Sequence, residues 1–198
     1  MHTARKGRIL PRASAADAAL TFDAILRAAT SSFIQSGFQG ASVDQIAKTA
    51  GVTRGAVYHH FTDKLGLLRA VVEAGHQRVA AAIVARADVQ SADPREALRA
   101  GCHAFVDSIT DDAAASVLLV EGPAVLGWSQ WRAIDASTSM RELREAMEAL
   151  VQGDDVEAFT HLLSGAMNEG VLWLIETPDN SKARESVHLA LDRLIDAL

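Results

Sequence analysis

Residues 50–61 read AGVTRGAVYHHF, a segment in which two glycines, an arginine, a tyrosine and two adjacent histidines lie close together. On both sides of Gly51 the apolar residues recur three or four positions apart, and this spacing predicts short helices over 43–50 and 54–60. Ser42 stands in the N-cap position of the first helix. Two short helices joined by a tight glycine turn are typical of a helix-turn-helix unit, whose second helix enters the major groove of DNA.

The helix predicted over 54–60 has one apolar face. Val57 and Phe61 are four positions apart and share this face, which we expect to pack in the core against Ile46. The other side chains point outward, where arginine and histidine can donate to base edges, small residues allow close approach, and other polar groups can bind phosphates. The candidate DNA contacts are Arg54 and His59 for bases, Gly55 and Ala56 for close approach, and Ser42, Thr53, Tyr58, His60 and Lys64 for phosphates.

The two adjacent histidines also raise the alternatives of a metal site and an acid/base centre. A metal site needs ligands that converge, as helical pairs do at positions i and i+4, whereas His59 and His60 diverge by about 100°. An acid/base centre needs a pocket and a nucleophile or paired carboxylates, which the surrounding sequence lacks. An exposed helix without a partner stays open as a further alternative. We therefore expect no metal ligand, no catalytic residue and no cofactor.

Charge divides the chain into two unequal parts. The net charge of the 198 residues is −6, from 19 Lys/Arg and 25 Asp/Glu. Residues 1–64 hold eight of the bases and four of the acids, a balance of +4, so residues 65–198 hold the other eleven bases and twenty-one acids, a balance of −10. A small basic part followed by a large acidic part indicates that only the first part contacts an anionic partner.

Composition and periodicity predict an all-α protein. Apolar residues make up 49% of the chain and aromatic residues only 5%, and no segment alternates at period two. The apolar stretches are too short or too interrupted for a membrane span, no signal-peptide run follows the basic N-terminus, and the single cysteine has no partner, so we expect a cytoplasmic protein. The other expected helices cover 15–36 with a cap at Gly37, 64–88, 94–110, 113–120, 124–152 in one piece or broken near 135–139, 155–176 and 181–197.

Residues 24–72 resemble the N-terminal signature of the tetracycline-repressor (TetR) family of transcription regulators. The resemblance implies a homodimer that reads a palindromic operator in double-stranded DNA, with Tyr58, His60 and Lys64 at positions that usually contact DNA in the family. The residues that carry it are Ala28, Phe33, Gly37, Phe38, Ser42, Ile46, Ala47, Ala50, Gly51, Val52, Tyr58, Phe61, Lys64 and Leu68.

The expected organisation has three parts. Residues 1–13 form a basic flexible arm, which either reaches an adjacent groove or is a disordered tail. Residues 14–64 form a three-helix helix-turn-helix DNA-binding domain. Residues 65–198 form a larger helical domain for ligand binding and dimerisation, which brings the total to about nine helices.

The last two predicted helices suggest a dimer interface. Residues 162–175 read LLSGAMNEGVLWLI, which is apolar nearly all round and needs cover on two sides. The final helix carries an apolar stripe, and packing both helices against their copies gives a two-fold four-helix interface. The alternative is that both helices fill the core of one monomer. The candidate interface residues are Gly165, Glu169, Gly170, Val187, Leu191, Leu194 and Ile195.

Aromatic residues in the acidic part suggest a pocket for a small apolar or aromatic effector. Trp128 and Trp131 lie three apart on one helical face. Asn168 and Glu169 interrupt an apolar run, so they either bridge the dimer or face a cavity. For each aromatic residue, plain core packing is the alternative. The candidate lining residues are Phe105, Trp128, Trp131, Phe159, Met167, Asn168 and Trp173.

These features predict a ligand-responsive transcriptional regulator, a repressor that binds its operator as a dimer and is released by an effector. The alternative is a DNA-binding regulator or architectural protein with no small-molecule effector, which a missing apolar cavity would indicate. A helical enzyme is a third class, but the chain has no phosphate-binding glycine loop, nucleophile elbow or metal-binding histidine pair.

Overall fold

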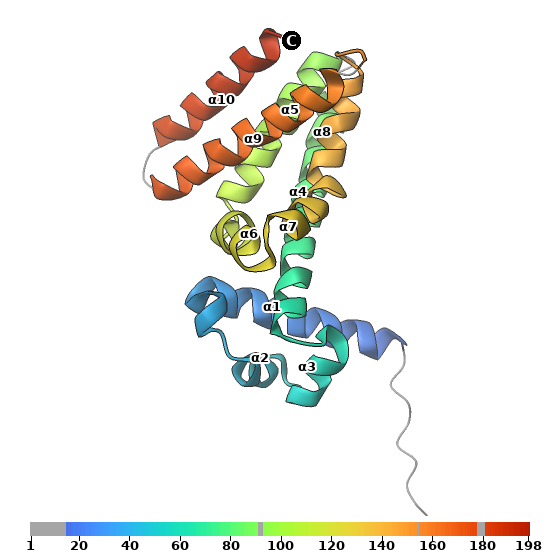
Figure 1. Ribbon diagram of the computed structural model, residues 1–198, viewed down its shortest axis with the longest axis vertical. Helices are drawn as coiled ribbons and strands as arrows, with labels where there is room; N and C mark the ends of the chain where they lie inside the picture. The colour runs from blue at the N-terminus through green and yellow to red at the C-terminus, as the bar shows by residue number, and fades with distance from the viewer. Residues whose placement is uncertain (1–14, 91–92, 154, 178–180) are drawn as a thin grey trace, which may run out of the picture.

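In the computed structural model, the described residues (15–90, 93–153, 155–177 and 181–198) form helices joined by short turns, with no β-strand among them (Figure 1). The all-α prediction is confirmed. The predicted arm over 1–13 lies outside the described residues. The elements are α1 (Ala15–Gly40), α2 (Val43–Ala50), α3 (Arg54–Phe61), α4 (Lys64–Gln90), α5 (Pro94–Thr110), the π-helical turn η1 (Val117–Glu121), α6 (Gly122–Leu126), α7 (Trp128–Ala136), α8 (Ser139–Glu148), α9 (Asp155–Glu176) and α10 (Ser181–Asp196).

Local capping contacts define α2 and α3. The Ser42 hydroxyl accepts the backbone N–H of Gln45 at 3.5 Å, and the Thr53 hydroxyl accepts that of Ala56 at 3.2 Å. Gly51 ends α2 with φ 71° and ψ 27°, a left-handed conformation that glycine adopts without steric cost. The turn between the two helices is therefore encoded by residues within it.

The lower domain in Figure 1 consists of α1, α2, α3 and the start of α4 around one apolar core. Val57 and Phe61 of α3 are only 1% and 5% exposed, and they belong to the same buried cluster as Ile46 of α2 and Phe33 of α1. The predicted buried face of the helix is thus confirmed. Because this face is held by the core, the polar side of α3 is directed to the surface.

The long helix α4 runs from the lower domain into the upper one (Figure 1). Its early turns bury Leu67 and Leu68, where α4 packs against α1 and α3. Its later turns bury Val79 and Ile83, where it packs against α5 and α8. One continuous helix therefore belongs to both domains. No helix in the described ranges combines the length and the apolar character that a membrane crossing requires.

The segment predicted as helix over 124–152 contains three helices, α6, α7 and α8. One break lies at Thr138, within residues 135–139, where the sequence analysis allowed for a break. The other lies at Gly127, whose φ of 82° and ψ of 147° are outside the helical region, and this break was not predicted. A glycine inside a periodic apolar pattern is compatible with a continuing helix, so the pattern alone does not reveal the interruption.

One further element differs from the prediction. In the segment predicted as a helix over 113–120, residues 115–116 are α-helical and the next five form the π-helical turn η1, in which Val117, Leu118 and Leu119 are buried. The predicted end of the first helix at Gly37 is confirmed, because Gly37 has a non-helical φ of 63° and ψ of 174°. The residues after this kink, up to Gly40, form a short helical continuation of α1.

Candidate functional site

Helix α3 presents Arg54 and Tyr58 together on the surface. Arg54 Nη1 lies 2.9 Å from Asp44 Oδ2 on α2, and Nη2 donates to the Tyr58 hydroxyl at 3.2 Å. The hydrogen bond to Tyr58 and the charge of Asp44 raise the pKa of Arg54. Because the guanidinium remains more than half exposed, Asp44 both orients Arg54 and competes with an anionic partner for it.

The two adjacent histidines of α3 have different surroundings. Their ring centres are 5.6 Å apart with an interplanar angle of 73°, so the side chains do not present their nitrogens to one point. His59 is exposed, whereas His60 is half-buried with its ring 6.1 Å from that of Phe22 on α1. Within the described parts of the chain, no three His, Cys, Asp or Glu side chains converge on a position suited to a metal ion.

Further polar groups of the lower domain are Lys64, the first residue of α4, and the N-terminal caps of α2 and α3. The Lys64 ammonium lies 4.7 Å from the centre of the Phe38 ring and donates to the Gln39 carbonyl at 3.4 Å, so the side chain is held against the end of α1. The hydroxyls of Ser42 and Thr53 accept backbone N–H groups as caps, and each retains its own O–H to donate. A helix N-terminus that also offers a hydroxyl donor is a favourable place for a phosphate.

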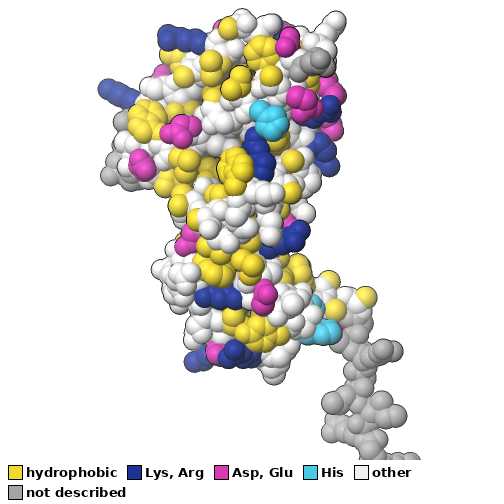
Figure 2. Space-filling view, viewed as in Figure 1, with side chains coloured by type: hydrophobic (Ala, Val, Ile, Leu, Met, Phe, Trp, Pro, Cys, Tyr) yellow, Lys and Arg dark blue, Asp and Glu magenta, His cyan; other side chains and the backbone are white. Residues whose placement is uncertain are grey.

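The middle of α3 offers an open surface. Gly55 is exposed, and a Cβ added there would meet only Thr53 Oγ1, at 3.8 Å, while Ala56 is half-buried. Figure 2 shows Lys and Arg side chains at the end of the lower domain formed by α2 and α3, and more Asp and Glu side chains over the upper domain. The predicted DNA contacts all lie between the cap of α2 and the first residue of α4.

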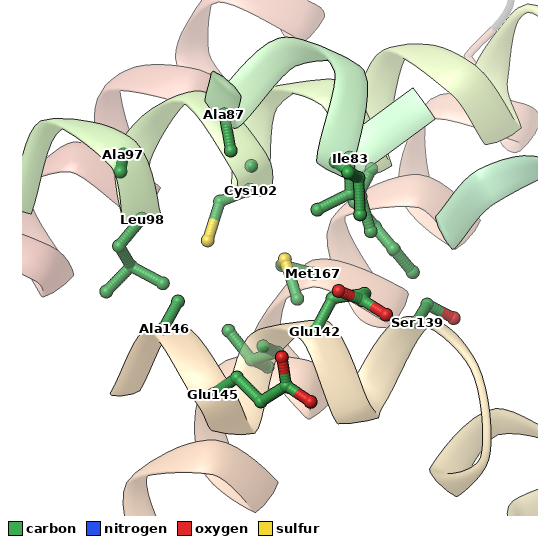
Figure 3. A pocket seen from close by; sticks show the side chains of 14 residues that line it. Ile83, Ala87, Ala97, Leu98, Cys102, Ser139, Glu142, Glu145, Ala146 and Met167 are labelled. Atoms are coloured by element: carbon green, nitrogen blue, oxygen red, sulfur yellow. The ribbon is translucent and has the colours of Figure 1, made fainter. Parts of the chain in front are cut away.

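The upper domain contains an apolar cavity of about 230 Å³ between α4, α5, α8 and α9 (Figure 3). Two predicted lining residues, Phe105 and Met167, line it. Cys102, which the sequence analysis did not propose, also lines it, and burial raises the pKa of its thiol to about 12. Leu98, Cys102 and Phe105 stand at i, i+4 and i+7 on α5. This spacing places the three side chains on one face of the helix, and from it Cys102 could have been predicted to line the same cavity as Phe105.

The other aromatic candidates do not line the cavity. Trp128, Phe159 and Trp173 are 64%, 38% and 46% exposed. Trp128 follows the unpredicted break at Gly127 and begins a new helix at the surface. The two α9 residues lie on the outer side of that helix. These three positions correct the prediction of a pocket built from aromatic side chains.

Trp131 and Asn168 are the remaining candidates outside the cavity wall. Trp131 is 2% exposed, and its indole N–H donates to the Leu118 carbonyl at 2.7 Å, so it is a core residue that holds η1. Asn168 is half-buried, and its side-chain oxygen is buried with no hydrogen-bond partner in the described residues. For Trp131, the structure therefore favours the alternative of core packing over ligand contact.

The apolar stripe of α10 packs within its own chain. Val187, Leu191 and Ile195 are 7%, 2% and 0% exposed in the core, where α10 contacts α5 and α9, and Gly170 of α9 packs against Val187. This placement corrects their assignment to the dimer interface, because side chains covered by α5 and α9 are not available to a partner. The predicted interface residues that stay exposed are Gly165, Glu169 and Leu194.

Other apolar side chains on the last two helices remain exposed and were not predicted as contacts. Leu162 on α9 is 70% exposed, and Leu189 on α10 is 50% exposed. With Trp173 and Leu194 they form what we call the outer apolar residues of α9 and α10. Figure 2 shows hydrophobic side chains gathered on the visible face of the upper domain. Large exposed apolar side chains on neighbouring helices are a common feature of protein interfaces.

A carboxylate joins the upper domain to the lower one. Both side-chain oxygens of Glu121, the last residue of η1, lie 3.0 Å from the backbone nitrogen of Phe38, which donates to them. A Cβ on the preceding residue, Gly37, would lie 2.5 Å from Glu121 Oε1. Glycine is favoured at position 37 mainly by its positive φ of 63°, since the carboxylate at the end of the Glu121 side chain can shift away from a Cβ. The two partners are 83 residues apart, so no local sequence pattern indicates the pair.

A buried polar network joins α4 to α7 and α8 beside the cavity. His76 of α4 is fully buried, with Nδ1 3.2 Å from Ser139 Oγ, and burial lowers the pKa of His76. The Ser139 hydroxyl donates to Asp135 at 3.1 Å, and Asp135 accepts from Arg132 at 2.8 Å. Ser139 also lines the cavity, so this network connects the cavity wall to a buried side chain of α4.

Sequence comparisons match both parts of the chain. A model of bacterial regulatory proteins of the tetR family matches residues 25–71, and a model of the tetracyclin repressor-like C-terminal domain matches residues 95–198. The chain is similar to the TetC protein of transposon Tn10 from Escherichia coli, with 26% identity over 139 residues, which cover 70% of each chain.

Solved structures share the fold over most of the chain. A tetR-family transcriptional regulator from Pectobacterium atrosepticum is 30% identical with a TM-score of 0.70, over 92% of this chain and 95% of that chain. The transcriptional regulator FadR from Bacillus subtilis, solved in complex with stearoyl-CoA, is 17% identical with a TM-score of 0.75, over 88% of this chain and 97% of that chain. At 17% identity the second likeness shows the fold alone.

Proposed function

The chain belongs to the tetracycline-repressor (TetR) family of transcriptional regulators, and on that premise we propose that it is a ligand-responsive repressor. In this proposal a homodimer binds a palindromic DNA operator through α3, and a small, largely apolar molecule in the upper-domain cavity releases it. The observation that carries the proposal is that one continuous helix, α4, connects an exposed, capped α3 to a domain with an apolar cavity.

We assign sequence reading to Arg54 and His59. Arginine pairs with the acceptor edge of guanine in the major groove, and the contact to Asp44 holds the guanidinium on the exposed side of α3. Tyr58, His60 and Lys64 are assigned to phosphates, which fix the position of the helix but carry no sequence information. Two copies of α3 then enter successive major grooves, roughly 34 Å apart.

The dimer is supported by the outer apolar residues of α9 and α10. Leu162 and Leu189 are at least half exposed in the single chain, and covering them with a second copy removes apolar surface from water. Pairing two copies of the same helices gives a two-fold interface. Such a two-fold axis matches the symmetry of a palindromic operator.

A small-molecule effector is favoured over an effector-free regulator by the cavity. A DNA-binding protein that answers only to a protein partner has no need for an apolar cavity in its second domain. Here four helices line about 230 Å³ that is partly open to solvent, and α4 supplies part of the wall. A molecule that binds there acts on the same helix that carries the lower domain.

The contact between Glu121 and Phe38 provides a second route between the domains. η1 is packed under Trp131 and ends at Glu121, which holds the end of α1. Single π-helical turns are frequent at functional sites. If effector binding shifts α4 and η1 together, the spacing of the two α3 helices changes, so effector and operator oppose each other through one coupling free energy.

The experiment that tests this function is selection of binding sites from a pool of random DNA duplexes by the full-length chain. We expect enrichment of an inverted repeat whose half-sites are about one helical turn apart. Recovery of asymmetric sequences, or no enrichment over the starting pool, would exclude the dimeric operator model.

Two variants and a control test whether the surface around α3 binds DNA. We expect Tyr58→Ala and Lys64→Ala each to weaken binding to the selected duplex about fivefold or more, because each removes one contact to the DNA backbone. Arg86→Ala, at an exposed position of α4 in the upper domain, removes a positive charge away from α3 and should leave affinity unchanged. Equal affinities for all three variants would refute the assignment of α3.

A further inference from the structure

The charged groups on the cavity wall are all acidic. Glu142 and Glu145 of α8 line the cavity, and no Lys, Arg or His is among its lining residues. Figure 3 shows the Glu142 carboxylate directed from α8 toward Met167 and the apolar side chains, whereas the Glu145 side chain lies at the outer side of the wall and is 63% exposed. The other ionisable group on the wall is the Cys102 thiol. With a pKa of about 12 it is uncharged at neutral pH.

The two carboxylates share one basic partner. Glu142 accepts from Arg141 at 2.6 Å, and Glu145 lies 4.0 Å from the same guanidinium. The Glu142 side chain is only 16% exposed, while that of Arg141 is 58% exposed and Arg141 does not line the cavity. Arg141 donates to Glu142 through both Nε and Nη2. Two carboxylates against one exposed guanidinium leave one excess negative charge at this wall, and Glu145, 63% exposed, carries most of it.

This charge distribution discriminates between ligand classes. A ligand with a carboxylate or phosphate would place a second negative charge near Glu142 without a basic residue to receive it. That arrangement is unfavourable because burial of an unpaired charge costs several kcal/mol. A cation with an apolar body would instead leave its hydrocarbon against Leu98 and Phe105 and its charge beside a carboxylate.

We propose that the effector of this chain is a lipophilic cation, a small molecule with an apolar body and one protonated amine or quaternary ammonium group. The proposal rests on the proposed function, because it takes the cavity as the effector site. Glu142 is the group that pairs with the cation, and Glu145 adds to the negative charge around it. The ligand class differs from the anionic stearoyl-CoA found with the fold relative FadR.

Calorimetric titration of the full chain with three matched compounds tests the ligand class. The compounds 4-phenylbutylamine, 4-phenylbutanol and 4-phenylbutyrate share one hydrocarbon body and differ in charge at pH 7. We expect the amine to bind at least about fivefold more tightly than the alcohol, and the carboxylate to bind more weakly than the alcohol. Ala146→Phe, which fills the cavity from α8, should abolish binding of all three.

Variants of α8 separate charge from shape. Glu142→Gln should remove the advantage of the amine over the alcohol, and Glu145→Gln, at a more exposed site, should reduce it. The control is Glu148→Gln, since Glu148 pairs with Arg144 at 2.7 Å on the same helix and does not line the cavity. It should keep the full advantage. Thermal melts establish that each variant is folded.

The outcomes distinguish this proposal from the one on which it rests. If the carboxylate binds as tightly as the amine, or if amine and alcohol bind equally, the ligand class is wrong while the cavity remains an effector site. If none of the three compounds binds at millimolar concentration, or if Ala146→Phe leaves binding intact, the assignment of the cavity as the effector site fails as well.

Discussion

The contact between Glu121 and Phe38 shows how a single residue can link two domains. Glycine at position 37 takes a positive φ that other residues rarely adopt, and the next residue, Phe38, offers its N–H to the carboxylate of Glu121. The sequence indicated the special backbone at Gly37, since a glycine at the end of a helical pattern is a recognisable signal. It did not indicate Glu121, because a side chain that caps a distant backbone group leaves no periodic trace.

Removal of the Glu121 carboxylate tests this link. Glu121→Ala leaves the Phe38 N–H without its charged acceptor, and we expect the free energy of unfolding to fall by about 1–2 kcal/mol. Urea denaturation measures the change. Glu73→Ala is the control, because Glu73 is in an exposed i,i+4 pair with Arg69 and such pairs contribute about 0.3–0.5 kcal/mol. Equal losses for the two variants would contradict the role of Glu121.

His76 predicts a pH dependence of stability. Burial lowers its pKa in the folded chain, so the unfolded chain takes up a proton below pH about 6.5 while the folded chain does not. Unfolding is therefore favoured as pH falls, by up to about 1.4 kcal/mol per pH unit, and the effect ends below the folded-state pKa. His188, whose pKa is also lowered by burial and by His103, acts in the same direction.

Matched variants isolate the contribution of His76. Chemical denaturation between pH 7.5 and pH 5.5 should show a smaller loss of stability in His76→Gln than in the unsubstituted chain. His59→Gln, which changes an exposed side chain, should retain the full dependence. The same pH slope in both variants would show that His76 is not the titrating group.

At the scale of helices, the sequence was most informative where caps and periodicity agree. α2 and α3 were predicted almost to the residue, because Ser42, Gly51 and Thr53 each act on their immediate neighbours. The interruption at Gly127 was missed, since its surroundings continue the helical period. The stripe of α10 was found correctly as an apolar face, but periodicity does not say whether the face meets its own chain or a second copy.

The exposed side of α9 leads to a prediction about assembly. Leu162→Glu places a charge on the outer apolar residues, and we expect at least about tenfold weaker dimerisation, because a central apolar contact is replaced by a charge that must be desolvated. Leu20→Glu is the control, since Leu20 is 68% exposed on α1 in the lower domain. Sedimentation equilibrium measures both. A dimer that is unaffected by Leu162→Glu would place the interface elsewhere.

At the scale of the whole molecule, only the acidic half of the charge division is seen in the described residues. Residues 15–64 hold four Lys/Arg and four Asp/Glu, so the basic excess of the first part comes from residues 1–14, which lie outside the described residues. The acidic excess lies over the upper domain (Figure 2). The fold could be predicted from periodicity and caps, and the DNA surface on α3 stays a prediction. The cavity could not be predicted, because its wall comes from four helices that are far apart in sequence. The aromatic residues suggested for it, such as Trp128 and Trp173, lie mainly on the surface.

The most direct test of the central claim is the affinity of the full chain for its selected operator and for the same duplex with five base pairs inserted between the half-sites. Five base pairs turn one half-site by about half a helical turn, so a dimer with fixed spacing between its α3 helices cannot engage both. Fluorescence anisotropy should then show a loss of affinity of at least about 30-fold. Unchanged affinity for the lengthened duplex would contradict recognition by a symmetric dimer.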